Sequence, residues 1–385
     1  HWGMELRLGG ADGSSVTGYL RDNTAHFENP EAYLPGREFI AAFSGQGAFK
    51  TDYIPAALSL SMTARESCVL VCGFCPEDEL AALTRPGTAR MALSRVCARW
   101  DDRLGSFSLR SPCRPLDHYM SCWAAYQSIA CRLLGRSSLY QSGGAIGFRD
   151  QLQDSINMLL LDWGYAREQI LDCCRHQYAE GDVMHWWHRH PQGDKGVRSR
   201  CSDDMLWLCW ALCEYVEATG DFALCDIQVG YLSSPPLGSG EQDRYESPEL
   251  SARTDSVLLH AQAALECCIS RGFGRHGLPR MLSGDWNDAL SDVEGESVWL
   301  AWFFSHCAGR FAKLLERLGR PGAQRYSSGA RQLGSAANAA WNGSWYIRAY
   351  YADGQALGGP ERIDSLVQSL SLIHISEPTR QEAIS

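Results

Sequence analysis

The sequence predicts a multidomain protein in which a β-rich N-terminal part is followed by a larger α-helical part. Residues 1–78 consist of short alternating or β-branched runs broken by Gly, Asn, Asp and Pro, which is typical of strands and turns. From Pro76 the composition shifts to Ala, Leu, Arg and Glu, and helix signals recur as far as Trp341. Helices of similar length, joined alternately by short turns and long loops, predict a helical toroid with its loops gathered at one end. The loose repeat period leaves a bundle or a solenoid as alternatives.

The strands are expected first in the chain and the helices after them. Residues 1–78 would form the end of a β-sandwich, with strands at Met4–Leu8, Val16–Leu20, Phe39–Phe43, Leu58–Met62 and Ser67–Val71. Residues 79–112 are predicted to be a helical linker, because Pro76–Trp100 fits one or two amphipathic helices. The toroid then covers residues 113–369. Its expected helices are Leu116–Leu134, Arg149–Leu161, Ala166–His176, Asp203–Ala218, Ser251–Ser270, Ser297–Leu318 and Ala323–Trp341.

The two ends of the chain require a separate interpretation. The segment LSLIHISEPTR (370–380) resembles the translation of an adapter used in sequencing libraries, and QEAIS follows it. We therefore exclude residues 370–385 from reasoning about fold and site, as non-native sequence. Because His1 is not an initiator Met, we expect a metagenomic fragment truncated at both ends. Such a fragment is expected to be poorly folded or inactive in isolation, since apolar helix faces would be exposed.

Composition argues against two classes of protein. A formal net charge of −10 disfavours a general nucleic-acid binder, whose phosphate-facing surface needs a cationic excess. The longest apolar runs, such as Val69–Cys75, are far shorter than the roughly 20 residues of a membrane span. The 16 cysteines are scattered, often on helix faces, and predict free buried thiols in a reducing, cytoplasmic compartment. Zinc at Cys68, Cys72 and Cys75 is the alternative, but no matching Cys or His pair follows, so no metal site is predicted.

The most unusual stretch is Glu180–Trp207. It gathers three His, two adjacent Trp, a run of cations and the pair Asp203 and Asp204. Each unpaired buried polar group costs about 1–3 kcal/mol, so we expect a loop that lines a site and not a piece of core. An apolar helical run follows the two carboxylates, so Ser202 or Asp203 could alternatively be a simple helix N-cap.

Residues in and beyond this stretch are typical of a site for a sugar and an anion. Aromatic faces pack against sugar rings, and Asp, Asn and Arg bond sugar hydroxyls. Trp186, Trp187, Trp286, Asn287 and Asp288 fit that description, although core packing is the alternative for each Trp alone. Guanidinium groups bind phosphate with paired hydrogen bonds, which suggests a phosphate site nearby, with a solvated charged loop as the alternative. The clustered cations are His185, His188, Arg189, His190, Lys195, Arg198 and Arg200.

Five ordered motifs carry a resemblance to a known family. They are YQSGGAIGFRDQLQD (140–154), EGDVMHWWH (180–188), VRSRCSDDMLWL (197–208), GDWNDAL (284–290) and GESVWLAWF (295–303). Together they closely resemble the family 94 glycoside phosphorylases, from about Ala81 to Ser369. This family includes cellobiose and chitobiose phosphorylases, 1,2-β-oligoglucan phosphorylase and the phosphorylase-like C-terminal part of cyclic β-1,2-glucan synthase. The sequences of two later segments, WYIRAYYADGQALG (345–358) and RIDSLVQS (362–369), look most like those of the β-1,2-glucan branch of the family.

The resemblance implies a fold and a reaction. The fold is a β-sandwich, a helical linker, an (α/α)6 barrel and a C-terminal jelly-roll-like domain, of which this chain would hold the first three, with the barrel incomplete at its C-terminus. The reaction is inverting phosphorolysis of a β-glucoside, in which phosphate attacks the anomeric carbon while a carboxylic acid protonates the leaving oxygen. Inorganic phosphate is then a co-substrate, and no cofactor is implied.

The resemblance also implies residue roles. Asp203, the first Asp of the SDD motif, would be the general acid, with a pKa raised by burial and neighbouring carboxylates. Asp204 would orient a helix or a sugar hydroxyl. Residues expected to contact sugar, including the acceptor-side Glu296, are Arg149, Asp150, Asp154, Asp285, Trp286, Asp288 and Glu296. Phosphate candidates are Arg198 and Arg200, then His185 and His188, with Ser365 in the turn 363–365.

Two departures from the family pattern bear on specificity. Cys201 stands where some members, notably cellobiose phosphorylases, carry Trp, which puts a cellobiose preference in doubt. The segment GGPERIDS (358–365) is shorter than in the β-1,2 branch, so the phosphate loop is expected to differ.

Partners and alternatives complete the expectations. We expect a β-linked gluco-oligosaccharide and phosphate as ligands, no nucleic acid and no membrane contact from this chain, with a homodimer as an option for the full-length protein. A hydrolase or transglycosylase remains an alternative, favoured if a carboxylate such as Glu361 or Asp364 faces the acid across the sugar. A non-catalytic β-glucan-binding part of a synthase is the third alternative.

Overall fold

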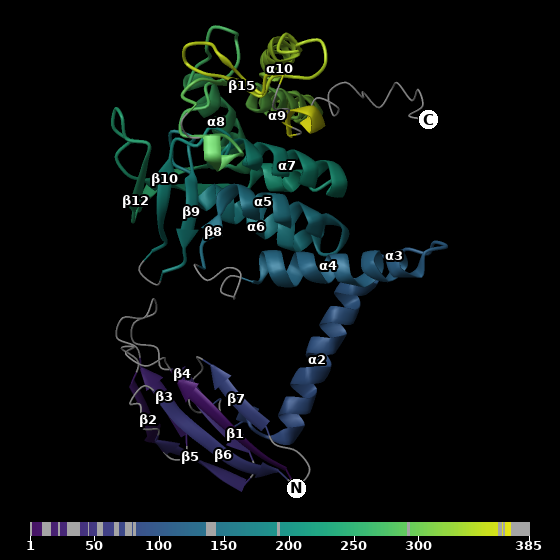
Figure 1. The fold of residues 1–385 in the computed structure, drawn as a ribbon, viewed down its shortest axis with the longest axis vertical. Helices are drawn as coiled ribbons and strands as arrows, with labels where there is room; N and C mark the ends of the chain where they lie inside the picture. The colour runs from purple at the N-terminus through teal and green to yellow at the C-terminus, as the bar shows by residue number, and fades with distance from the viewer. Residues whose placement is uncertain are drawn as a thin grey trace. The chain divides into compact units, whose positions relative to one another are not determined.

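The chain divides into two compact units, residues 1–105 and 106–385, in the computed structural model (Figure 1). The structure describes residues 2–9, 17–21, 24–28, 39–44, 46–51, 57–64, 69–73, 79, 82–135, 144–190, 193–290, 293–360, 364 and 366–370. Most of the predicted adapter-like tail lies outside these residues, and its assignment stays a prediction.

The first unit contains two antiparallel sheets. The three-stranded sheet has the order β1-β6-β5, formed by Trp2–Gly9, Ala57–Ala64 and Gln46–Thr51. The four-stranded sheet has the order β2-β3-β4-β7, formed by Thr17–Arg21, Thr24–Glu28, Phe39–Ser44 and Val69–Gly73. All five predicted strands are confirmed. Sequence reasoning missed β3 and β5, which are short and flanked by further strands rather than by long turn signals.

Helix α2 (Pro86–Gly105) follows these sheets in the same unit, within the predicted linker. The expected amphipathic face is not found, because no described side chain of α2 is buried. Met91, Leu93 and Val96 are 61%, 64% and 51% exposed. Met91 and Leu93 lie about 200° apart around the helix axis, so they do not share one face. Among the described residues of this unit, none buries these side chains.

The second unit is built mainly from helices. A continuous helical stretch covers 114–133, partly with π-helical hydrogen bonding, and α5 (Phe148–Ile156) leads directly into the 3-10 turn η3 (Asn157–Leu160). The later helices are α6 (Trp163–Arg175), α7 (Leu206–Thr219), α8 (Val257–Ser270), α9 (Val298–Arg317) and α10 (Ala323–Asn338). Each predicted helix therefore has a counterpart. One boundary is wrong, since residues 251–256 belong to strand β13 and not to the start of α8.

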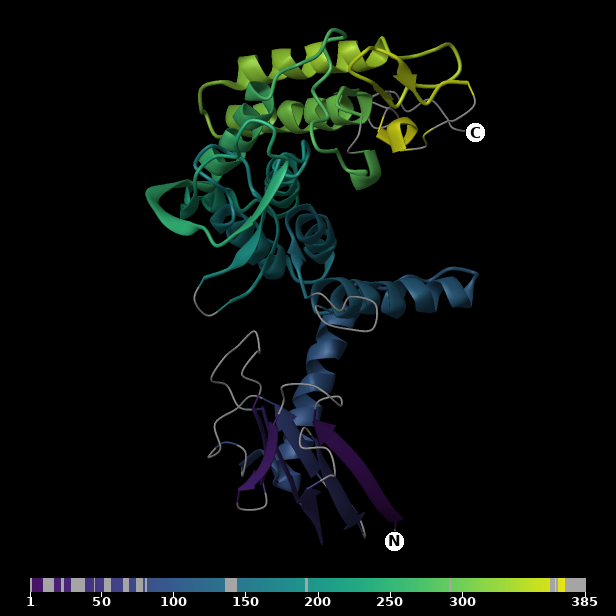
Figure 2. The same ribbon diagram turned by 60° about the vertical axis from the view of Figure 1, so that its left-hand side comes forward.

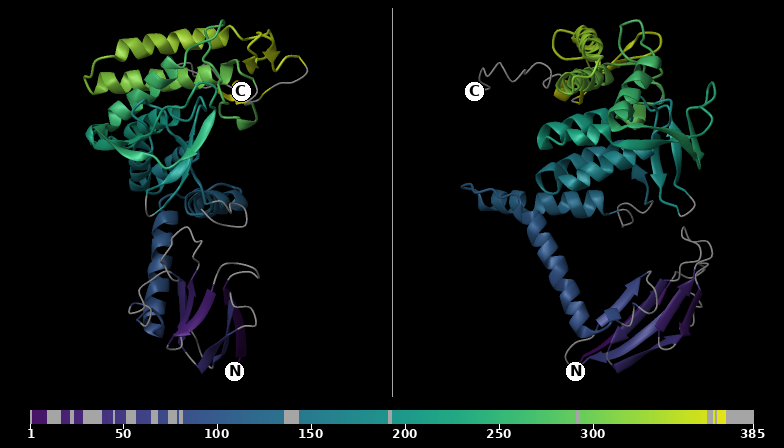
Figure 3. Two further views of the ribbon diagram at one scale, coloured as in Figure 1. Left: turned by 90° about the vertical axis from the view of Figure 1, so that its left-hand side faces the viewer. Right: turned by 180° about the vertical axis from the view of Figure 1, so that it is seen from behind.

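The core of this unit lies between the helices. Helix α7 buries most of its side chains, and only the positions around Trp210, Glu214 and Glu217 and its last turn remain partly exposed, as expected of a core helix. Helix α9 is capped by Ser297, whose hydroxyl accepts a hydrogen bond from the Leu300 amide at 2.9 Å and so satisfies a free backbone donor. Helices α9 and α10 lie side by side (Figures 2 and 3), while α5, α6 and α7 form a stack (Figure 1).

Small sheets lie at the ends of these helices. The four-stranded sheet β12-β10-β9-β8 is formed by Asp243–Glu246, Lys195–Ser199, Met184–His188 and Ile146–Gly147, and lies at one end of the α5–α7 stack (Figure 1). Two further sheets pair β11 (Gln228–Ser233) with β13 (Glu249–Ser256), and β14 (Glu296–Ser297) with β15 (Ala349–Tyr350) and β16 (Ala356–Leu357). The molecule thus combines helices with open sheets. Among the helices that the structure describes, none is long and apolar enough to cross a membrane.

The predicted loop between Glu180 and Trp207 is in fact an antiparallel hairpin of β9 and β10. Val197 pairs with Trp186, and Gly196 pairs with Trp187. A Cβ on Gly196 would lie 2.1 Å from the Trp186 carbonyl oxygen, so only glycine fits there. The buried polar side chains of this stretch, such as Arg198 and Asp204, are compatible with burial because they meet specific partners.

Candidate active site

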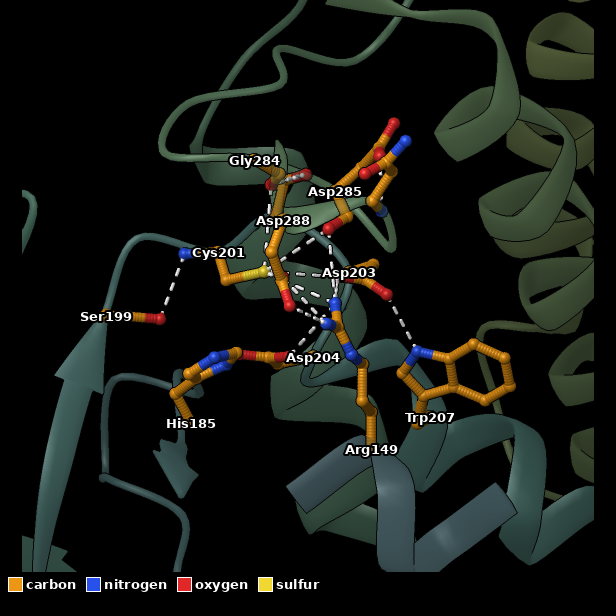
Figure 4. A network of polar contacts seen from close by, with 12 residues as sticks. Arg149, His185, Ser199, Cys201, Asp203, Asp204, Trp207, Gly284, Asp285 and Asp288 are labelled. Carbon is orange, nitrogen blue, oxygen red and sulfur yellow. Dashed lines mark hydrogen bonds and ion pairs between the residues drawn. The ribbon is translucent and has the colours of Figure 1, made fainter. Parts of the chain in front are cut away.

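Three segments that are far apart in the sequence meet at Arg149. Helix α5 supplies Arg149 from its first turn, the segment before α7 supplies Cys201, Asp203 and Asp204, and the turn before β14 supplies Asp288. Figure 4 shows the guanidinium at the centre of these groups. The motifs FRD, SDD and DWND, recognised separately in the sequence, are therefore brought together by the fold.

The Arg149 guanidinium contacts three carboxylates. Its Nη2 bonds both oxygens of Asp288 at 2.7 Å, while Nη1 lies 3.2 Å from Asp203 Oδ1 and 4.0 Å from Asp204 Oδ1. Nη1 also donates to the Asp285 carbonyl at 3.1 Å. Burial opposes the charged form, but these anions outweigh burial and hold the pKa of Arg149 above its ordinary value. Arg149 thus stays cationic and fixes the geometry of the cluster.

Asp203 is fully buried, and its two oxygens have different neighbours. Oδ2 accepts a hydrogen bond from the Trp207 indole Nε1 at 2.8 Å, and Oδ1 lies 3.2 Å from Arg149 Nη1 and from Cys201 Sγ. Burial and the adjacent negative charge of Asp204 raise the pKa of Asp203 to about 7. A carboxyl with this pKa can hold a proton near neutral pH and give it up, which is the property of a general acid.

Asp204 is the ionised member of the pair. Its Oδ2 lies 2.7 Å from His185 Nδ1, and this ion pair with Arg149 nearby holds the pKa of Asp204 below its ordinary value despite burial. In return, the charge of Asp204 raises the pKa of His185 to about 9. His185 is therefore an imidazolium at neutral pH, with 23% of its side chain exposed. The site thus sets Asp203, which can carry a proton, beside the ionised Asp204 and the two cations Arg149 and His185.

A metal ion is poorly suited to this cluster. His185, Cys201 and Asp204 place possible ligand atoms within 4.8 Å of one another. However, Arg149 Nη1 lies 3.8 Å from Cys201 Sγ and 4.0 Å from Asp204 Oδ1, where a second cation would be repelled. Burial also raises the pKa of the Cys201 thiol well above its ordinary range, which disfavours the thiolate that binds metals.

Asp203 does not cap helix α7, which corrects the alternative left open by the sequence. The helix begins at Leu206 after Met205, and no side chain caps it. The Ser202 hydroxyl instead donates to the Gly284 carbonyl at 2.8 Å. The Asp203 side chain turns toward Arg149 and Trp207, so its carboxyl is committed to the polar cluster.

A second buried cluster lies beside the first and was missed by sequence reasoning. Arg348 from the segment leading into β15 forms an ion pair with Asp285 at 2.6 Å, and both side chains are at most 1% exposed. The remaining Asp285 oxygen accepts from the Ser297 hydroxyl at 2.6 Å. Asp285, predicted to contact sugar, is thus fully occupied by protein groups. Nothing in the sequence around Arg348 marks it as the partner of a residue 63 positions away.

The predicted aromatic platforms divide into exposed and buried rings. Trp187 is 0% exposed and stacks on His176 with ring centroids 3.8 Å apart, so it belongs to the core and is not a sugar platform. Trp186, on the other face of β9, is half-buried and lies against Tyr245 and His188. Trp286 is 40% exposed beside Asp285. Strand alternation, hidden by the expectation of a loop, separates the two adjacent Trp residues.

The arginines predicted to bind phosphate are engaged elsewhere. Arg198 is 1% exposed, pairs with Asp182 at 2.7 and 2.8 Å, and lies over the Tyr178 ring at 3.9 Å. Arg200 donates to backbone carbonyls of the segment 237–241. Because protein acceptors take the donors of both guanidinium groups, these side chains stabilise the sheet and are not available to an anion in this structure.

Other predicted contacts are also accounted for. Glu296 is buried and accepts from the backbone of His276 and Leu278 and lies 2.6 Å from the His276 ring nitrogen, so it holds this turn. Asp154 forms an ion pair with Arg132 at 3.0 Å, whereas Asp150 is exposed. His188 lies half-buried on β9. Ser365, like Glu361, lies outside the described residues, so these predictions have no structural counterpart.

The accessible side of the site is formed by a few of these residues. From solvent inward, the side chain of Asp288 is 64% exposed, that of Arg149 is 9% exposed and that of Asp203 is 0% exposed. Exposed surface is also retained by three residues of the motifs 180–188 and 284–290, namely His185, Trp186 and Trp286. A polar ligand would therefore meet Asp288, Arg149 and aromatic rings before it reaches the acid.

Residues 99–377 match the catalytic-domain model of the glycosyl hydrolase 94 superfamily. The chain belongs to this family. Within family 94, the chain is 38% identical over 292 residues to the cyclic β-(1,2)-glucan synthase NdvB of Rhizobium meliloti, covering 73% of this chain and 10% of the synthase.

Two phosphorylases are also similar to this family 94 chain. The N,N'-diacetylchitobiose phosphorylase of Vibrio proteolyticus is 28% identical over 76% of this chain and 38% of its own length. The solabiose phosphorylase of Paenibacillus borealis is 28% identical over 72% of this chain and 33% of its own length. The chain thus spans well under half the length of each of these relatives.

Proposed function

We propose that this chain carries the active site of an inverting glycoside phosphorylase, with Asp203 as the general acid. The observation that supports it best is the buried Asp203 carboxyl, with a pKa of about 7, which contacts Arg149, while His185 pairs with the adjacent Asp204. The similarity to two phosphorylases agrees with the reaction type.

The chemistry requires one acid and an anion site. A phosphate oxygen attacks the anomeric carbon from the face opposite the leaving group while the glycosidic C–O bond breaks. The Asp203 proton passes to the leaving oxygen, which gives α-glucose 1-phosphate, a shortened sugar and ionised Asp203. An inverting hydrolase needs a second carboxylate to activate water. Phosphate is already anionic, so positioned cations can replace that base.

We assign roles to the accessible residues on this basis. His185 is the favoured phosphate-facing cation, because Arg198 and Arg200 are engaged with protein acceptors. His188 and Ser365 remain proposals for the same ligand. Five residues are proposed to contact the sugar, because each belongs to a family motif and is either exposed to solvent or located beside Asp203. They are Arg149, Asp150, Trp186, Trp286 and Asp288.

The proposed substrate is a β-1,2-linked gluco-oligosaccharide. This choice rests on the 38% identity to a cyclic β-(1,2)-glucan synthase, which exceeds the 28% identity to the phosphorylases. We further infer that α5 to α10 belong to an (α/α)6 barrel preceded by a β-sandwich and a helical linker, with boundaries as predicted from the sequence.

The test is release of glucose 1-phosphate from β-1,2-gluco-oligosaccharides with and without inorganic phosphate. We expect release only with phosphate, and a loss of at least about 100-fold in kcat for Asp203→Asn, because the proton donor is removed. Asp226→Asn, which alters an exposed carboxylate paired with Arg320, is the matched control and should keep full activity. Turnover that is indifferent to phosphate would instead indicate a hydrolase or transglycosylase. Sugar binding without turnover would indicate a binding domain.

A further inference from the structure

Trp207 makes a contact with the candidate acid that the proposed reaction has not used. The Trp207 indole Nε1 donates to Asp203 Oδ2 at 2.8 Å, whereas Arg149 and Cys201 lie 3.2 Å from Oδ1. Figure 4 shows the indole and the guanidinium on opposite sides of this carboxyl. An indole nitrogen can only donate a hydrogen bond, so Oδ2 is an acceptor whether Asp203 is ionised or protonated.

We propose that Trp207 is a positioning residue for the acid: its indole N–H holds Oδ2, so that the transferable proton resides on Oδ1, on the side that faces Arg149. The proposal rests on the role of Asp203 as general acid. Oδ1 is the better proton carrier because its bond from Arg149 is longer, at 3.2 Å, and Arg149 Nη1 also donates to the Asp285 carbonyl.

The residues packed around Trp207 restrict its indole ring to one orientation. Trp207 lies in the first turn of α7, four residues after Asp203, and is 7% exposed. Its ring packs against Phe303 with centroids 4.3 Å apart and against Trp210 at 5.3 Å. Asp203 itself is 0% exposed, so water does not compete for Oδ2. A fixed donor against a buried acceptor fixes the torsion of the carboxyl.

The protonation of Asp203 depends on several groups besides Trp207. Burial and Asp204 raise the pKa of Asp203 to about 7, while Arg149 and the Trp207 hydrogen bond act in the opposite direction. An N–H donor bonds an anionic oxygen more strongly than a neutral one, so losing Trp207 must raise this pKa. The titratable and charged groups facing this carboxyl or its neighbour are Arg149 on α5, His185 on β9, Cys201 and Asp204 before α7, Cys268 and Arg271 at the end of α8, and Asp285 and Asp288 before β14.

The decisive comparison is Trp207→Phe against Trp299→Phe. Trp299 is 2% exposed, packs on the same Phe303, and its indole nitrogen has no hydrogen-bond partner among the described residues, so the second change is the same substitution without the contact. The pKa of Asp203 is followed by carbon NMR of protein labelled at Asp carboxyls, with the signal identified by its loss in Asp203→Asn. We expect the Asp203 pKa to rise by about 0.5 to 1 in Trp207→Phe. Equal values in the two Trp variants would overturn the proposal.

The kinetic readout separates positioning from a structural role. In Trp207→Phe the alkaline limb of the pH profile, where kcat/KM falls as pH rises, should move to higher pH by the same amount as the Asp203 pKa. The plateau kcat should fall about tenfold or more with KM little changed, because the acid loses its fixed orientation. A lower plateau with an unmoved limb would mean that Trp207 only supports the fold, against the proposal.

Failure of the proposed function can be distinguished from failure of this inference. If the unmodified chain unfolds cooperatively, and is therefore folded, yet releases no glucose 1-phosphate, the phosphorylase assignment fails, while the NMR titration still decides whether Trp207 controls Asp203. If Trp207→Phe does not fold, the Trp207 indole proton is followed in the unmodified protein, identified as the indole signal displaced by Asp203→Asn. That signal should titrate with the midpoint of Asp203, and an indole proton indifferent to this midpoint would overturn the proposal.

Discussion

The properties of Asp203 and Asp204 diverge although they are neighbours in the chain. Asp204 has its own cation in His185 at 2.7 Å, whereas Asp203 has only a long contact to Arg149, whose other nitrogen is taken by Asp288. One carboxyl is therefore held ionised and the other is held near its protonation midpoint. Two carboxyl groups whose pKa values are pushed apart are the arrangement expected when one acts as acid.

The charge of Asp204 should set the pH range in which the enzyme works. With an Asp203 pKa of about 7, kcat/KM should fall as pH rises above 7, because the protonated acid disappears. In Asp204→Asn the negative neighbour is gone, so ionised Asp203 is less disfavoured and its pKa falls. The alkaline limb should then move to lower pH, which a pH profile of kcat/KM measures. A limb that stays in place would show that another group controls it.

At the scale of elements, the β9–β10 hairpin shows how a polar segment becomes part of the interior. Arg198 on β10 joins Asp182 and lies over Tyr178, while Trp187 stacks on His176 beneath the sheet. Trp186 and His185, on the same strand β9, keep exposed surface. Alternation thus separates the adjacent rings of Trp186 and Trp187, whereas His185 lies at the irregularity in the β9–β10 register and keeps its exposed surface there.

This division predicts different outcomes for two neighbouring arginines. Arg198→Ala removes the partner of the largely buried Asp182 and should lower the free energy of unfolding by about 3–5 kcal/mol. Arg200→Ala loses bonds to backbone carbonyls on a half-buried side chain and should cost about 1–2 kcal/mol. Urea unfolding measures both. If Arg198→Ala instead left stability intact and raised the KM for phosphate, Arg198 would be a phosphate ligand after all.

At the scale of the molecule, the cysteines follow the core. Nine of the fourteen described cysteines are buried, which confirms the sequence expectation for those nine. Cys72, Cys97, Cys113 and Cys131 are exposed and Cys122 is half-buried, against that expectation. Cys68 and Cys75, the other members of the considered zinc set, lie outside the described residues. Burial raises the pKa of thiols such as Cys201, Cys268 and Cys307, so they stay protonated.

Thiol labelling should therefore occur in two stages. A soluble alkylating reagent is expected to modify the exposed cysteines of the native protein quickly, and the buried nine only when the second unit unfolds, because a buried protonated thiol is not a nucleophile. Peptide mass spectrometry after brief labelling, with and without urea, assigns each site. Rapid labelling of Cys209 or Cys307 without urea would contradict the packed core described here.

The sequence determined the helices and the identity of the family. Long segments with helical periodicity specify their own structure locally, so each predicted helix has a counterpart, with an error of a few residues at α8 where polar residues before the helix pair as a strand. The motifs around Arg149, Asp203 and Asp288 also indicated a shared site, because their residue types suit one chemistry.

Only the tertiary structure decided which polar residues face a ligand. Whether Arg198, Asp285 or Glu296 is free depends on partners far away in the chain, such as Arg348 for Asp285 and His276 for Glu296. Such pairs leave no local pattern, because the free energy that permits a buried charge comes from the partner it meets after folding. The hydrogen bond from Trp207 to Asp203 could be predicted from the sequence only in part. Its four-residue spacing is visible in the sequence, but only the buried, fixed indole shows that the contact can orient an acid.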